Sequence, residues 1–304
     1  MSTAPPLPLP QQLLAVARDI KLSHTVFALP FALLATFLAA GWAERAPRVG
    51  EFLLILLCMV TARTYAMAVN RWADAGIDAQ NARTAARVLP NGLVSKPFMA
   101  GVCVVNAILF VSVAACFFFA YDNAWPVILS PLVLLVLGGY SYTKRFTWAC
   151  HAVLGFALAI SPVAAAIAIE PGYLARPTIW LLMAMVWCWV AGFDILYALQ
   201  DTEADRELGL YSIPSRLGVG PALWISRALH AASAGALIAV ALVAVQLGVL
   251  FVIAAGLTCG LLLIEHALVW GGRTHQLNMA FFTVNGVISV ALGVAGIVDV
   301  LTAS

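Results

Sequence analysis

Long apolar runs dominate this chain and restrict it to one class of fold. A helix needs about 20 residues to cross the ~30 Å hydrocarbon core of a bilayer. About nine runs of that kind occur, at residues 25–43, 51–70, 98–120, 125–142, 150–169, 178–200, 221–246, 248–270 and 278–302. Only 10% of the 304 residues are charged, against roughly 25% in soluble domains. The sequence therefore predicts an all-α polytopic membrane protein with about nine transmembrane helices.

The first residues differ in composition from the rest of the chain. The segment MSTAPPLPLPQQ is rich in proline and lacks the basic residues that open a signal peptide. We expect residues 1–20 to form a flexible amino-terminal leader and residues 21–304 to form one membrane domain.

Lysine and arginine are unequally divided between alternate loops. Most lie in the amino-terminal segment or follow the second, fourth, sixth and eighth runs, whereas the other side holds Arg45, Arg48 and Arg176. We expect a multi-pass protein of the cell (inner) membrane, and the positive-inside rule places its amino terminus and the loops with the two acidic groups described below in the cytoplasm. A net charge of +2 without a basic stripe does not indicate a nucleic-acid partner, and no protein partner can be read from the sequence.

Two spaced groups of polar side chains include five of the 14 acidic residues. They contain Asn70, Asp74 and Asp78 in one case and Asp194, Asp201 and Asp205 in the other. Spacings of four, seven and eleven residues bring side chains close to one face of a continuous helix. Like charges four residues apart cost a few tenths of a kcal/mol per pair, which a divalent cation would remove. Mg²⁺ suits this pattern because it binds carboxylates together with substrate phosphates.

Basic residues near these segments could serve phosphate oxygens. Arg63 lies inside the second run, seven residues before Asn70 and hence on the same helical face. Lys144 and Arg145 follow Tyr140 after the fourth run. Lys144 and Arg145 could instead be ordinary orientation signals at a helix end, and Tyr140 an ordinary interface residue. The acidic loops could likewise be solvated connectors. The five histidines show no metal-ligand spacing and are expected to be hydrogen-bonded packing residues.

These segments resemble the motifs of the UbiA superfamily of intramembrane aromatic prenyltransferases, most closely its 4-hydroxybenzoate polyprenyltransferase branch. Residues 70–78 match NxxxDxxxD, and DILYALQDTEAD at 194–205 matches DxxYAxxDxxxD. Further matches are RTAARVLPNG, YSYTKRFT and AFFTVNG, so that the resemblance covers about residues 15–300. RVLP replaces the commoner RPLP, and the first run opens with KLSHTVFALP instead of an Asp-Lys-Pro type. These departures affect the predicted identity of the acceptor more than the predicted chemistry of the donor.

The resemblance implies a role for each matching position. Two Mg²⁺ ions would be held by Asn70, Asp74, Asp201 and Asp205. Asp78 and Asp194 would complete the two groups, as ligands or as residues that support the ligands. Arg63, Lys144 and Arg145 would contact the diphosphate. Asp194, Tyr140 and Tyr197 are the expected catalytic residues near the reacting centre.

The expected function is Mg²⁺-dependent transfer of a polyprenyl group from polyprenyl diphosphate to the ring carbon ortho to the hydroxyl of 4-hydroxybenzoate, in ubiquinone biosynthesis. One alternative acceptor is 1,4-dihydroxy-6-naphthoate, in menaquinone biosynthesis, because KLSHTVFALPFAL and KRFTWACHAVLG resemble a sub-branch that includes such enzymes. A membrane transporter is the remote alternative, since polar residues inside spans also mark ion pathways.

Overall fold

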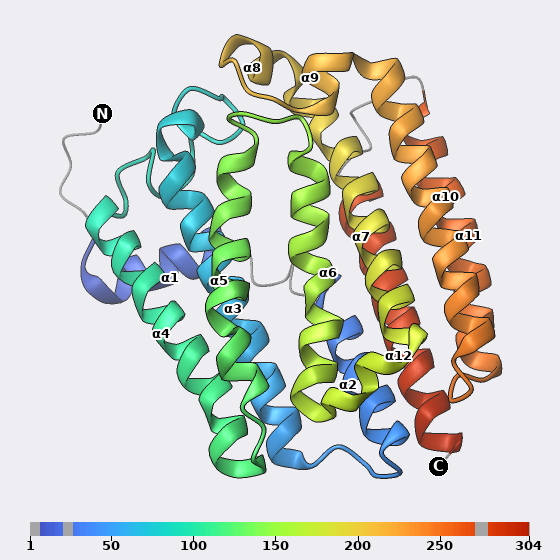
Figure 1. Ribbon diagram of the computed structural model, residues 1–304. Coiled ribbons are helices and arrows are strands. Elements are labelled where there is room, and N and C mark those ends of the chain that lie inside the picture. Colours follow the sequence, from blue (N-terminus) through green and yellow to red (C-terminus); the bar gives the residue numbers. More distant parts are fainter. Residues whose placement is uncertain (1–6, 21–26, 271–278, 304) are drawn as a thin grey trace. The chain divides into compact units, whose positions relative to one another are not determined.

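The computed structural model describes residues 7–20, 27–270 and 279–303, without the side chains of 279–281. In those ranges the regular structure is helical and contains no strand (Figure 1). This confirms the all-α membrane fold.

Within the described residues, eight helical segments are long and apolar enough to cross a membrane. They are α3 (Val49–Asp78), α4 (Lys96–Tyr121), α5 (Trp125–Thr143), α6 (Cys150–Ile169), Pro177–Glu207, α10 (Val219–Val243), α11 (Val249–Leu268) and Phe282–Ala303. The span Pro177–Glu207 comprises α7 (Pro177–Ala198), the 3-10 turn η3 (Leu199–Asp201) and α8 (Thr202–Glu207). The last comprises the end of the π-helical turn η5 (Met279–Val284) and α12 (Asn285–Ala303).

The first of the nine predicted runs corresponds to a shorter helix. Helix α2 (Leu29–Trp42) has 14 residues and begins with Pro30 in its first turn, where a missing N–H costs no hydrogen bond. Its chain turns away at Glu44, which has a φ of 56°. About nine membrane-associated helices therefore agree with the sequence, but α2 by itself is too short to cross a bilayer.

Capping contacts mark both places where neighbouring apolar runs are separated by only a few residues. Helix α4 begins after Ser95, whose side chain accepts a hydrogen bond from Phe98 N, and ends at Asp122 in the left-handed conformation. Helix α11 begins after Gly248, and the buried Asp299 accepts hydrogen bonds from Gly248 N (2.8 Å) and Phe251 N (2.7 Å). The start of α11 thus has its free N–H groups bonded by a carboxylate.

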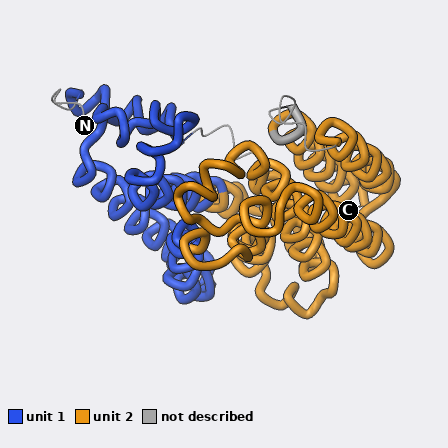
Figure 2. Tube along the Cα trace, turned by 90° about the horizontal axis from the view of Figure 1, so that it is seen from above, with its two compact units in different colours: residues 1–25, 56–142 blue, residues 26–55, 143–304 orange. Residues whose placement is uncertain are grey.

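The chain divides into two compact units, drawn in different colours in Figure 2. Unit 1 comprises residues 1–25 and 56–142, and unit 2 comprises residues 26–55 and 143–304. Unit 1 contains α1 (Leu9–Asp19), most of α3, α4 and α5. Residues 1–20 were expected to form a flexible leader, but residues 9–19 form helix α1. Val16 and Ile20 pack into a buried cluster with Ala68 and Met99.

In the described part of unit 2, six helices form a ring in which each packs on the next. The order of contacts is α6, α7, α10, α11, α12, α2 and back to α6. Glycine allows two of these close approaches: a Cβ on Gly155 would lie 2.6 Å from Trp187 O, and one on Gly293 would lie 2.6 Å from Pro30 Cβ. Small residues at helix contacts are the usual device of membrane bundles. The unit also contains the short helices η2 (Pro171–Ala175), α8 and α9 (Ile213–Leu217), the turns η3 and η5, and the first residues of α3.

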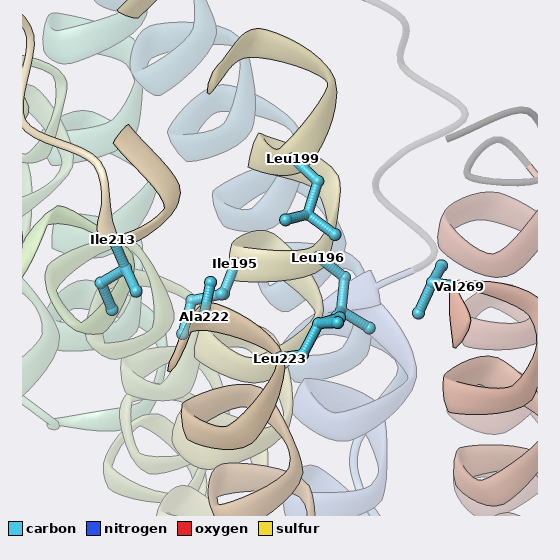
Figure 3. Close-up of a cluster of buried hydrophobic side chains, with 7 residues drawn as sticks. All are labelled: Ile195, Leu196, Leu199, Ile213, Ala222, Leu223 and Val269. Atoms are coloured by element: carbon cyan, nitrogen blue, oxygen red, sulfur yellow. The ribbon is translucent and has the colours of Figure 1, made fainter. Parts of the chain in front are cut away.

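A buried apolar cluster in unit 2 anchors the chain around the second acidic segment (Figure 3). Ile195 and Leu196 come from α7, and Leu199 comes from η3. The other members are Ile213 of α9, Ala222 and Leu223 of α10, and Val269. Because α7, η3, α9 and α10 all contribute, the segments before and after residues 199–207 are held together by one core.

Candidate functional site

The first polar segment forms the end of α3. Asn70 Nδ2 donates a hydrogen bond to Asp74 Oδ2 at 3.1 Å, which confirms that these two side chains share a helix face. Asp74 is 1% exposed and Asp78 is 3% exposed. Carboxylates this deeply buried need partners to remain charged.

Asp78 has such a partner in the loop that follows α3. Arg87 Nη1 lies 2.8 Å from each carboxylate oxygen of Asp78. The hydroxyl of Thr84 also donates to the backbone carbonyl of Asp78, at 3.1 Å. The loop therefore folds back on the end of the helix, and Arg87 pairs with the Asp78 carboxylate.

Asn70 is connected to helix α1 through Arg71. Arg71 Nη1 donates to Asn70 Oδ1 at 2.8 Å, and Arg71 Nε donates to Asp19 Oδ2 at 2.8 Å. The side chains of Arg71 and Asp19 are 7% and 13% exposed, so this ion pair is largely removed from water. The residues expected to form a leader thus help to orient the first motif, which sequence spacing did not indicate.

Arg63 lies on α3 about two helical turns before Asn70, inside a membrane span. Its Nε is buried and has no hydrogen-bond partner in the part of the chain that the structure describes. Tyr140 of α5 and Arg71 interact with Arg63 electrostatically, and the Tyr140 hydroxyl donates to Ala66 O at 3.5 Å. A guanidinium with an unbonded donor in a span is the group that an anion would complete.

The second acidic segment is not one continuous α-helix. Asp194 belongs to α7, Asp201 ends the 3-10 turn η3, and Asp205 lies in α8. A 3-10 turn has three residues per turn, so η3 changes the register that a continuous α-helix would give these three side chains. Asp205 interacts with Ser212 and, electrostatically, with Asp201 and Lys144.

Asp194 forms the shortest side-chain contact around this segment. His151 Nδ1 of α6 lies 2.6 Å from Asp194 Oδ2, and His151 Nε2 lies 3.2 Å from the backbone N of Ile213. The sequence marked His151 only as a packing residue. Its partner is 43 positions away along the chain, so no local spacing could have shown the pair; only its place in the segment KRFTWACHAVLG gave a hint.

The remaining candidates of unit 2 lie near the same loop or on α7. Lys144 O accepts a hydrogen bond from Tyr211 N at 2.7 Å, which ties the residues after α5 to the loop after α8. The Lys144 side chain is half-buried and that of Arg145 is exposed. The Tyr197 ring packs edge-on against Phe282, with centroids 6.3 Å apart.

The first motif offers oxygen ligands of the kind that Mg²⁺ binds. Asn70 and Asp74 bring an amide and a buried carboxylate together within one motif, and oxygen donors of this kind fit Mg²⁺. Among the described residues, no three His, Cys, Asp or Glu side chains gather at one point. The two motifs belong to different units, so a metal site that both share stays a prediction.

Comparison with known proteins identifies the family. The model of the UbiA prenyltransferase family matches residues 28–287. The fold resembles a UbiA homolog from Aeropyrum pernix K1, with a TM-score of 0.81, 32% identity and coverage of 92% of this chain and 98% of that one. A UbiA homolog from Archaeoglobus fulgidus bound to GPP and Mg²⁺ shares the fold, with a TM-score of 0.69, 18% identity and coverage of 95% and 99%.

Curated relatives include two named 4-hydroxybenzoate octaprenyltransferase. The one from Nitrosospira multiformis is 29% identical over 235 residues, which are 75% of each chain. The one from Aliivibrio salmonicida is 31% identical over 180 residues, and the match spans 59% of each chain. With a family match over most of its length and a structural relative above 30% identity, this membrane chain belongs to the UbiA prenyltransferase family.

Proposed function

We propose that this enzyme transfers a polyprenyl group from polyprenyl diphosphate to the ring of an aromatic hydroxy acid, with 4-hydroxybenzoate as the acceptor, in ubiquinone biosynthesis. The observation that carries the donor half is the arrangement on α3, where Asn70 and Asp74 are paired and Arg63 Nε is buried without a partner among the described residues. The acceptor half rests on relatives named 4-hydroxybenzoate octaprenyltransferase.

The proposed metal ligands for two Mg²⁺ ions are Asn70, Asp74, Asp78, Asp201 and Asp205. Bound Mg²⁺ would neutralise charge on the diphosphate and on the departing pyrophosphate. Within the first motif, Arg71 and Arg87 orient Asn70 and Asp78 by the hydrogen bonds described above. Asp78 contributes to this site in part by holding Arg87, since both of its oxygens contact that guanidinium.

The proposed diphosphate ligands are Arg63, Lys144 and Arg145. Arg63 offers donors in a fixed plane, which matches phosphate oxygens, whereas Lys144 offers a point charge. Preorganised cations stabilise the negative charge that develops as the bond between the prenyl carbon and the diphosphate oxygen breaks.

The bond change itself follows from the chemistry of the substrates. Cleavage of the carbon–oxygen bond leaves an allylic cation, and the ring carbon ortho to the acceptor hydroxyl attacks it. Loss of the ring proton restores aromaticity. Asp194, Tyr140 and Tyr197 are the residues that we place near this centre, and the surrounding apolar helices keep water from trapping the cation.

We also propose that the protein lies in the cell (inner) membrane with its amino terminus and both acidic motifs on the cytoplasmic side. The division of Lys and Arg between loops supports this orientation. The lipid bilayer would then hold the isoprenoid tail while the charged head reaches the motifs from the cytoplasmic face.

The test supplies membranes containing the protein with polyprenyl diphosphate, Mg²⁺ and both acids, and identifies products by mass spectrometry. Prenylated 4-hydroxybenzoate is the expected product. A prenylated 1,4-dihydroxy-6-naphthoate alone would move the assignment to menaquinone biosynthesis; of the segments that suggested that branch, residues 21–26 of KLSHTVFALP lie outside the described residues. Absence of any prenylated product would contradict the proposal.

A further inference from the structure

The pair formed by His151 and Asp194 has a definite hydrogen-bond direction. The backbone N–H of Ile213 can only donate, so His151 Nε2, at 3.2 Å, accepts. The ring proton of the neutral imidazole then lies on Nδ1, which donates to Asp194 Oδ2 at 2.6 Å. Both nitrogens of His151 are therefore used, and the imidazole is held in one tautomer and one orientation.

The two members of the pair differ in exposure. The His151 side chain is 4% exposed, whereas that of Asp194 is 22% exposed. The histidine is thus enclosed by protein, and the carboxylate keeps an open side. In the described part of the chain, His151 is the hydrogen-bond partner found for Asp194, which leaves Asp194 Oδ1 able to accept from another molecule.

The pair is also anchored at both ends by the apolar cluster of Figure 3. Ile213, which donates its N–H to His151, places its side chain in that cluster. Ile195 and Leu196, which directly follow Asp194, belong to it as well. A carboxylate held in this way has little freedom to turn, and fixed geometry is what a general base requires.

We propose that His151 is a positioning residue that holds Asp194 as the base for the acceptor. This inference rests on the proposed function. As the prenyl carbon bonds to the ring carbon, the adjacent ring C–H bond breaks, its electron pair returns to the ring, and the proton passes to Asp194 Oδ1. Asp194 becomes a carboxylic acid and returns the proton to water after the product leaves. His151 keeps its Nδ1 proton throughout.

The other candidates for this proton suit the task less well. A neutral tyrosine hydroxyl is a poor base at neutral pH, and that of Tyr140 donates to Ala66 O. A carboxylate accepts without first losing a proton. The arrangement therefore favours Asp194 over Tyr140, with His151 as the residue that makes Asp194 available in one orientation.

The experiment compares the wild type with His151→Leu and His151→Gln in detergent-purified protein. Glutamine carries a donor and an acceptor at one end, as imidazole does on its ring, whereas leucine has neither. Each protein is assayed with acceptor carrying hydrogen or deuterium at the ring carbon that receives the prenyl group. His230→Leu is the matched control, because His230 is another buried helix histidine with hydrogen bonds to protein.

We expect kcat of His151→Leu to fall ~10²-fold, with KM for polyprenyl diphosphate changed less than about twofold. A primary deuterium effect should appear in that variant, since proton removal becomes slow. His151→Gln should keep most of kcat, and His230→Leu should show no deuterium effect whatever its stability.

Three results would overturn the inference: an unchanged kcat in His151→Leu, a lower kcat without a deuterium effect, or equal losses in His151→Gln and His151→Leu. If His151→Leu does not fold, Asp194→Asn carries the same test, because it removes the base while keeping its shape. Wild-type activity in that variant would be equally fatal. A wild type that forms no prenylated product would instead count against the proposed function.

Discussion

The ion pair between Asp78 and Arg87 can be examined by a double-mutant cycle. Arg87→Met removes a guanidinium nitrogen that lies 2.8 Å from both oxygens of Asp78. The two side chains are 23% and 4% exposed, for Arg87 and Asp78 respectively. Hydrogen bonds to charged groups contribute about 1.5–3 kcal/mol, and removing one partner of a buried pair costs about 3–5 kcal/mol. Because Arg87 is partly exposed, we expect Arg87→Met to lower the free energy of unfolding by about 2–4 kcal/mol.

The assay is unfolding in mixed detergent micelles, which gives a free energy of unfolding for each variant. Asp78→Asn, Arg87→Met and the double variant complete the cycle, and we expect a coupling energy of at least ~1.5 kcal/mol. Arg83→Met is the matched control in the same loop, where an exposed side chain should contribute less than ~0.5 kcal/mol. A coupling below ~0.5 kcal/mol would refute the reasoning that Arg87 compensates a buried Asp78 carboxylate.

Three further predictions concern separate features of the fold and the site. Arg63→Met should keep or raise thermal stability in detergent, because it removes a buried donor that makes no hydrogen bond among the described residues. The same variant should lower kcat/KM ~10²-fold, because it removes a proposed phosphate ligand. A clear drop in stability would contradict this reasoning. Asp299→Ala should lower the free energy of unfolding by about 1–3 kcal/mol because two N–H groups of α11 lose their acceptor, and Asp299→Asn should lose less; equal losses would count against the cap. Gly192→Ala should cost about 1–3 kcal/mol, because its Cβ would lie 2.2 Å from His230 Cδ2, and an unchanged unfolding temperature would show that the contact is loose.

Hydropathy was sufficient to place the spans. Bilayer thickness fixes the length of an apolar helix, so each predicted run has a corresponding helix, and even the short breaks at Asp122 and Gly248 lie where the sequence suggested. The exception is α2, which is shorter than its run because the helix begins only at Leu29.

The site was predictable where it depends on helical spacing and not where it depends on tertiary contacts. The pairing of Asn70 with Asp74 follows from their separation of four residues. The break at η3 does not, because hydropathy reads through a 3-10 turn. The contacts of His151 with Asp194, and of Arg71 with Asp19, join segments 43 and 52 residues apart. One sequence contains no signal for such pairs.

The central claim is that both acidic motifs serve one Mg²⁺-dependent prenyl transfer, and metal titration of the motif variants tests it most directly. Prenylated product is measured in membranes with the wild type, Asp74→Asn and Asp201→Asn, across Mg²⁺ concentrations and in EDTA. We predict that EDTA abolishes wild-type activity and that each variant loses at least ~10²-fold in kcat/KM. Product formation by the wild type in EDTA, or wild-type rates in either variant, would contradict the claim.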